Sequence, residues 1–159
     1  MSKIVLDKVL RKFPDDIIDS HNRLGNETVI IKKEALLKVC AFIKENRQLK
    51  MDMLVDLTCV DYPEEAERFM MVYHFYSTEN KYRLRVKAPV EEEDPYIDSL
   101  TGMWLNSNWP EREVYDMFGV KFNEHPNLKR LLMYESFEGH PLRKDYAITK
   151  RQPLVGPLN

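Results

Sequence analysis

The residues best suited to chemistry lie in one short stretch of this sequence, residues 109–146. Two His-Pro steps begin there at His125 and His140, and three carboxylates stand close together: Glu111, Glu113 and Asp116. Neighbouring carboxylates can act as general acid and base, and together with histidines they can hold a metal ion. One hypothesis is therefore a small hydrolase that uses these carboxylates with His125 or His140.

A structural role explains the same pattern more simply. Pro110 suits the first turn of a helix and Gly119 the position just past its end, so the sequence predicts a short helix over residues 110–118. Within it, Arg112 and Asp116 stand four residues apart and can form an ion pair. No His or Cys follows a carboxylate at i+3 or i+4, as it does in many helical metal sites. We expect charges that pair within the helix or across an interface, and histidines that make structural hydrogen bonds.

The common motifs of a stand-alone active site are missing from the sequence. There is no glycine-rich phosphate loop, no GxSxG turn and no CxxC pair. Cys40 and Cys59 lie in apolar patterns, which predicts buried thiols in a reducing compartment. An iron–sulfur cluster would need ligands from another chain. We therefore predict no catalytic residue, no metal and no cofactor in this chain.

Composition favours a globular domain without a nucleic-acid partner. The chain has 159 residues, 43% of them hydrophobic and 31% charged, and a formal net charge of -2. Nucleic-acid binding normally needs a clearly basic face, which this balance does not provide. No apolar run approaches the roughly 18 residues that span a bilayer, so we expect contact with a membrane only through partners.

Hydrophobic spacing predicts an α+β domain over residues 1–108. Helical spacing covers residues 3–13, where Pro14 ends it, and residues 33–47. Alternating or β-rich patterns predict strands, namely residues 17–31 with a turn at Gly25-Asn26, 53–61, 68–77 and 82–88. Pro89 is expected to end the sheet. A helix through Ile97, Leu100 and Trp104 is then expected after the acidic run 91–94, whose charges suit a helix N-terminus.

The C-terminal part is predicted to form a helix followed by an extended arm, residues 109–146, and a proline-containing tail, residues 147–159. Pro126 predicts a second brief helical turn, with Leu128, Leu131 and Leu132 facing inward and Lys129 and Arg130 facing out. Residues 140–146 have neither strand alternation nor helical period, so they need a surface to lie on. The predicted fold is α+β, an antiparallel or mixed sheet with helices packed on it, followed by an irregular C-terminal arm.

The ordered residues of this region resemble a known family. Two blocks carry the resemblance, Glu111-Arg112-Glu113-Val114-Tyr115-Asp116-Met117-Phe118-Gly119 and Gly139-His140-Pro141-Leu142-Arg143-Lys144-Asp145-Tyr146, joined by Phe122, His125-Pro126, Leu128 and Arg130-Leu131-Leu132. They closely resemble the 30-kDa subunit family of respiratory complex I, which in bacteria is the C subunit of NADH-quinone oxidoreductase. The motifs cover about a quarter of the chain.

The resemblance implies a non-catalytic, cofactor-free subunit of the peripheral arm of proton-translocating NADH:quinone oxidoreductase. FMN and the iron–sulfur clusters would belong to partner subunits, and the large quinone-site subunit would be a principal partner. The expected location is the cytoplasmic side of the bacterial inner membrane. Partner-interface residues assigned on this basis are Arg112, Glu113, Asp116, His140, Arg143, Lys144 and Tyr146. The alternative is the equivalent subunit of a related membrane-bound hydrogenase or ferredoxin-linked oxidoreductase.

Overall fold

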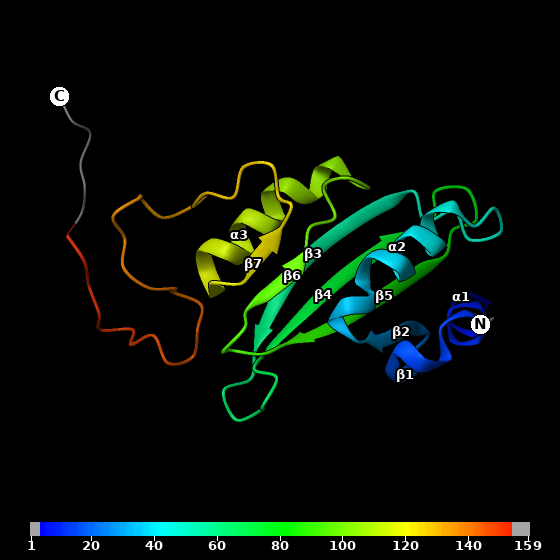
Figure 1. The fold of residues 1–159 in the computed structure, drawn as a ribbon, viewed down its shortest axis with the longest axis horizontal. Helices are drawn as coiled ribbons and strands as arrows, with labels where there is room; N and C mark the ends of the chain where they lie inside the picture. Colours follow the sequence, from blue (N-terminus) through cyan, green and yellow to red (C-terminus); the bar gives the residue numbers. More distant parts are fainter. Residues whose placement is uncertain (1–3, 154–159) are drawn as a thin grey trace.

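A five-stranded sheet forms the centre of the computed structural model, which describes residues 4–153 (Figure 1). The strands are β1 (Ile17–Arg23), β2 (Asn26–Ile31), β3 (Met53–Asp61), β4 (Phe69–Tyr76) and β5 (Arg83–Val90). The helices are α1 (Ile4–Lys12), α2 (Leu36–Glu45) and α3 (Asn108–Phe118), with short 3-10 turns at Pro14–Asp16, Lys33–Ala35 and Leu105–Ser107. Strands β6 (Tyr96–Asp98) and β7 (Lys121–Asn123) form a second, two-stranded sheet.

The main sheet is mixed, in the order β1-β2-β5-β4-β3. The pairs β1–β2, β3–β4 and β4–β5 are antiparallel, whereas β2 and β5 run parallel. Helix α2 makes the connection between β2 and β3. The predicted α+β class, with a mixed sheet and helices packed on it, is confirmed.

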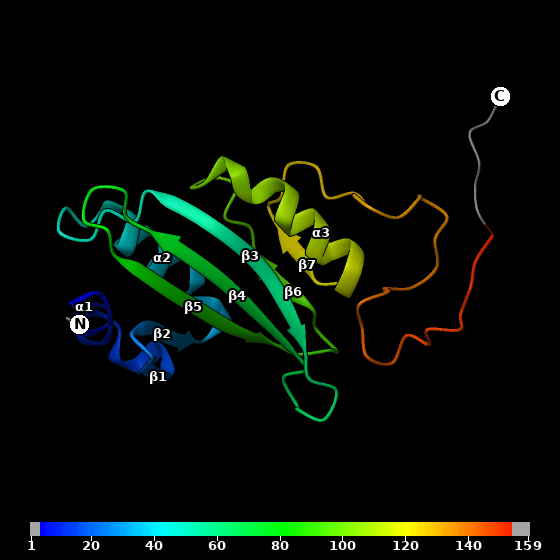
Figure 2. The same ribbon diagram turned by 180° about the vertical axis from the view of Figure 1, so that it is seen from behind.

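One face of the sheet is covered by helices α1 and α2, and no helix of residues 4–153 lies on the other (Figures 1 and 2). Strand β5 shows why only one face is covered by helices. Its apolar residues Leu84, Val86 and Ala88 are buried on the covered face. The alternate residues Arg83, Arg85 and Lys87 point to the opposite face. Helix α2 buries its apolar stripe against the covered face through Leu36, Val39, Cys40 and Ile43. We call the uncovered side the open face.

The C-terminal elements share the core of the main domain. Helix α3 packs beside β3, and β7 pairs with β6 next to it (Figure 1). One cluster of buried side chains runs from Val5 in α1 through Trp104 to Phe118 and Phe122. Residues 109–123 are therefore built into the domain, and the irregular arm begins after β7.

Pro89 does not end the sheet, contrary to the prediction. Strand β5 continues to Val90, and Pro89 lies opposite Met70 of β4. On its other side, β5 pairs with β2 only as far as Lys87. Beyond that point β5 has a free side, where a residue without an N–H group is tolerated.

The predicted helix through Ile97, Leu100 and Trp104 is also wrong. All three side chains are buried, but residues 96–98 form strand β6, in which Ile97 lies opposite Phe122. The acidic run 91–94 is consequently not at a helix N-terminus, and its Asp94 carboxylate instead pairs with Lys33 at 2.9 Å. Short apolar spacing identified the core residues but not the element that carries them.

Both cysteine thiols are buried and free, as predicted. Burial raises the pKa of the Cys59 thiol to about 12, and it raises that of Cys40 further. Within residues 4–153, none of the helices has the length and apolar character needed to cross a bilayer.

Candidate docking site

The two blocks that carry the resemblance, residues 111–119 and 139–146, are called here the signature blocks. Helix α3 carries the first of them and ends where the sequence predicted. Gly119 has φ of +83° and donates its N–H to the carbonyl oxygen of Tyr115 at 3.0 Å, which is a left-handed C-cap. Val114, Met117 and Phe118 are buried in the core. The last carbonyl groups of the helix then point toward the arm.

Residues 140–143 of the arm supply the donors that those carbonyl groups need. His140 Nδ1–H donates to the carbonyl of Asp116 at 2.9 Å, and the N–H of Leu142 donates to that of Met117 at 3.1 Å. Arg143 Nε–H donates to the carbonyl of Phe118 at 2.6 Å. A helix leaves its final carbonyl groups without intrahelical partners, so the second signature block completes the end of the first.

The Asp116 carboxylate fixes the middle of the arm. Its side chain is fully buried and accepts three backbone N–H groups at 2.8–3.0 Å, those of Leu131, Leu132 and Met133. Arg130 Nη1–H also donates to it at 2.6 Å. Burial alone would raise the pKa of Asp116, but these donors more than offset it and the pKa is lowered.

This arrangement corrects two predictions. Asp116 pairs with Arg130 and not with Arg112, whose guanidinium donates to the backbone carbonyls of Lys129 and Arg130 at 3.0 and 3.1 Å. The helical turn expected after Pro126 does not form, because N–H groups in that segment bond to the Asp116 carboxylate instead. Leu132, expected to face inward, is 57% exposed.

Glu111 and His125 form a second buried polar group, under the start of α3. Glu111 accepts the hydroxyl of Ser99 at 2.6 Å and the N–H of Leu100 at 2.7 Å, and burial raises its pKa. His125 Nε2–H donates to the Asn108 carbonyl at 3.2 Å while Nδ1 accepts the N–H of Asn127 at 3.0 Å. Since one nitrogen donates and the other accepts, the imidazole is neutral, and burial lowers its pKa.

A buried guanidinium, Arg68, ties the end of the arm to the sheet. It is 5% exposed and pairs with Asp61 at 2.7 Å, Glu92 at 2.7 Å and Asp145 at 3.0 Å. Asp61 also accepts the backbone N–H of Lys144 at 2.6 Å. Hydrogen bonds from Arg68 lower the pKa of both Asp61 and Asp145. The sequence analysis missed Arg68, because charged residues are mostly exposed and its acidic partners lie 7, 24 and 77 positions away in the chain.

The structure places the predicted interface residues in two groups. Arg112, Asp116, His140 and Arg143 bond to their own chain, as described above. Tyr146 is half-buried, stacked on Phe137 at 6.1 Å between ring centroids, with its hydroxyl accepting Gln152 Nε2–H at 2.9 Å. The side chains of Glu113 and Lys144 are exposed.

Several apolar side chains around this site are exposed: Trp109 (68%), Leu132 (57%), Leu142 (50%) and Ile148 (99%). Sequence reasoning did not single out Trp109 as an exposed residue. Within residues 4–153, no group of three or more His, Cys, Asp or Glu side chains is placed to hold a metal ion. The geometry therefore presents apolar side chains on an arm whose backbone is held in place.

Comparison with known proteins identifies the family. The family described as "Respiratory-chain NADH dehydrogenase, 30 Kd subunit" matches residues 29–152. The chain belongs to this family. Among curated members, the C subunit of NADH-quinone oxidoreductase from Trichlorobacter lovleyi is 47% identical over 157 residues, which cover 97% of this chain and 96% of that one. The same subunit from Geotalea uraniireducens is 44% identical over 154 residues, covering 96% and 93%.

Two solved structures agree with this architecture. A trypsin-resistant fragment (1-134) of Nqo5 superposes with a TM-score of 0.69 at 30% identity, covering 80% of this chain and 100% of the fragment. A chain of the membrane-bound sulfane sulfur reductase, an archaeal respiratory membrane complex, gives a TM-score of 0.77 at 20% identity and covers 92% and 86%. The second similarity shows a shared fold.

Proposed function

We propose that this chain is a structural, cofactor-free subunit of the peripheral arm of a proton-translocating NADH:quinone oxidoreductase. In this role it supports electron transfer from NADH through flavin and iron–sulfur centres, held by partner subunits, to quinone. Its partners are the large quinone-site subunit and the iron–sulfur subunits, and it reaches the cytoplasmic side of the bacterial inner membrane through them. Relatives at 44–47% identity, each the C subunit of an NADH-quinone oxidoreductase, support this assignment over a hydrogenase or ferredoxin-linked complex.

One observation carries the docking role: the signature residues hold an arm in place while its apolar side chains stay exposed. Asp116, His140 and Arg143 are used within the chain, and they fix the backbone on either side of Leu132 and Leu142. Exposed apolar side chains on a fixed backbone lose little conformational entropy when a partner covers them. Exposed apolar side chains grouped on one surface are typical of sites where a partner protein binds.

The hydrolase hypothesis receives no support from the site. Glu111 and Asp116 are fully buried and accept hydrogen bonds from their own chain. The His125 imidazole is occupied at both nitrogens. Of the three carboxylates, only Glu113 faces solvent, and a single exposed carboxylate lacks the second group that acid–base hydrolysis needs.

Gentle solubilisation and purification of the affinity-tagged chain from its native cell tests the proposal. We expect recovery with iron–sulfur subunits, an NADH-oxidising flavoprotein and membrane subunits. Recovery with a hydrogenase would replace the proposal by its alternative. Recovery of the chain alone, or stoichiometric flavin in the isolated chain, would refute both.

Substitutions on the arm test where docking occurs. The pair Trp109→Ala, in α3 beside the arm, with Leu142→Ala, on the arm, removes exposed apolar side chains and should lower recovery of partner subunits about tenfold. The matched control is Ile18→Ala with Leu37→Ala, which are 50% and 41% exposed and lie away from the arm. Equal recovery of partners by both pairs would contradict the docking role of the arm.

A further inference from the structure

The open face of the sheet carries a row of three cations. Arg83, Arg85 and Lys87 alternate with buried residues along β5, so their side chains all project from this face. Alternate residues of a strand are about 7 Å apart, which spreads the three charges over about 13 Å. In Figure 2, which views this face, no helix of residues 4–153 lies in front of β5.

These cations lack acidic partners. Within the described residues, none of the three lies within 4 Å of a carboxylate oxygen. Arg83 instead lies over the ring of Tyr76, 4.7 Å from its centroid. His74, opposite Arg85 on β4, has its pKa lowered by burial and then by the nearby cations, while Asp56 acts in the opposite sense. The row is therefore a positively charged strip without ion-pair partners among the described residues.

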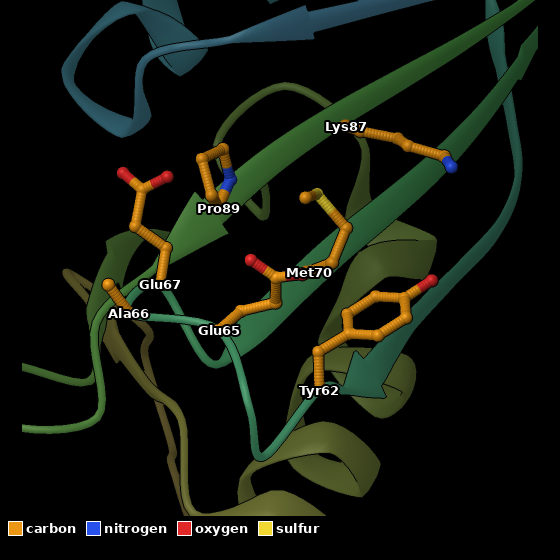
Figure 3. Close-up of a pocket in the computed structure, with 7 residues that line it drawn as sticks. All are labelled: Tyr62, Glu65, Ala66, Glu67, Met70, Lys87 and Pro89. Carbon is orange, nitrogen blue, oxygen red and sulfur yellow. The ribbon is translucent and has the colours of Figure 1, made fainter.

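A hollow of about 420 Å³ adjoins the end of this strip (Figure 3). Figure 3 shows Met70, Pro89 and Tyr62 around it, with Lys87 further along the strand that carries Pro89. Met70 and Pro89 lie directly opposite each other on β4 and β5. Tyr62 is 44% exposed. The hollow thus offers an apolar floor beside a row of positive charge.

We propose that the open face docks an acidic segment of a neighbouring subunit. Its carboxylates pair with Arg83, Arg85 and Lys87, and one of its apolar side chains enters the hollow at Met70 and Pro89. This rests on the proposed function, because the neighbouring subunit is a member of that assembly. It adds a second contact surface, on elements separate from α3 and the arm.

Charge complementarity selects an acidic protein segment over other anionic partners. Glu65 and Glu67 line the hollow, and a phosphate-covered surface laid across the face would meet these carboxylates. The chain as a whole also carries a net charge of -2. A protein segment can place carboxylates on the strip and an apolar side chain in the hollow, which satisfies both parts of the face.

Charge reversal in the native assembly tests the proposal. The triple variant Arg83→Glu, Arg85→Glu, Lys87→Glu should lower the yield of co-purifying subunits per tagged chain by about tenfold or more. The control variant Arg11→Glu, Lys12→Glu, Arg47→Glu makes the same change in net charge at cations elsewhere and should stay within about twofold of the wild type. If the triple variant does not fold, as judged by thermal unfolding, the single variant Lys87→Glu replaces it.

A photoreactive residue placed at Met70 identifies what covers the face. We expect a cross-link to an acidic peptide of another subunit in the purified assembly. A cross-link to lipid, to nucleic acid or to a second copy of this chain would overturn the proposal, as would no cross-link with the triple variant assembling normally. If the unmodified chain recovers no partner subunits, the proposed function itself fails, so the two failures are distinguishable.

Discussion

Gly119 lies where the arm packs against the end of helix α3, and replacing it with alanine should weaken that contact. The residue adopts φ of +83°, and a Cβ there would lie 2.6 Å from His140 Nε2 and 2.7 Å from Arg143 Nη2. A side chain in the left-handed region costs about 1 kcal/mol. To remove the clash, the side chains of His140 and Arg143 must shift, and we expect this to break their hydrogen bonds to the carbonyls of Asp116 and Phe118.

Loss of those two hydrogen bonds sets the larger part of the cost. Leaving a buried acceptor unsatisfied costs about 1–3 kcal/mol, less where water reaches the freed carbonyl. Adding the backbone strain, we expect Gly119→Ala to lower the free energy of unfolding by about 3 kcal/mol. Urea unfolding at neutral pH measures it. The control is Gly102→Ala, where a Cβ meets no atom within 4 Å, and its change should stay within about 0.5 kcal/mol.

A double-mutant cycle separates the clash from a general effect on folding. If a Cβ at position 119 acts by displacing His140, then His140→Ala should cost much less in the Gly119→Ala background than in the wild type. Strictly additive effects, or a cost of Gly119→Ala no greater than that of Gly102→Ala, would refute the reasoning.

Three further predictions concern the buried charges. Arg68→Ala leaves Asp61 buried without its partner, so it should cost about 3–5 kcal/mol in urea unfolding, and adding Asp61→Ala should recover part of that loss; no recovery would argue against the pair. The pKa of Asp116 is lowered in the folded state. The stabilisation from this carboxylate is therefore present above the unfolded pKa of about 3.9 and is lost as pH falls through the folded pKa. We expect the free energy of unfolding to decline with acid, and Asp116→Asn to flatten that decline. The pKa of Glu111 is raised in the folded state. Its contribution to the free energy of unfolding is therefore present below about pH 4.3 and is lost as pH rises through the folded pKa. Glu111→Gln should gain stability relative to the wild type between acid and neutral pH, and parallel pH profiles of the two proteins would contradict this.

The elements that the sequence predicted well are those whose signal is local. Helices α1 and α2 show helical spacing, and strands β3 to β5 show alternation or β-rich runs bounded by turn residues. Gly119 at the end of α3 is likewise a local signal. In contrast, β6 and β7 are only three residues each, and they pair although they lie far apart in the chain. Local sequence patterns do not indicate such a pairing.

The chemistry of the site was only partly predictable for the same reason. A helix end must find donors for its carbonyl groups, which the sequence implies, but the choice of His140 and Arg143 depends on where the arm returns. The Asp116 carboxylate binds N–H groups 15 to 17 residues away, and this replaced both the expected Arg112 pair and the expected helical turn. Tertiary hydrogen bonds decided both cases.

Because the arm bonds to the last carbonyl groups of α3, the segment between these two points should tolerate insertions. The segment between the two signature blocks is a closed loop, since Asp116 and His140 are 24 positions apart and bonded to each other. Loop-closure entropy rises slowly with length, so doubling a flexible loop costs only about 0.6 kcal/mol. Glu135 and Ser136 lie within it, so a short epitope or fluorophore-binding sequence inserted between them should leave both anchored ends bonded. That position offers a label close to the proposed docking arm without changing any of the residues that hold it.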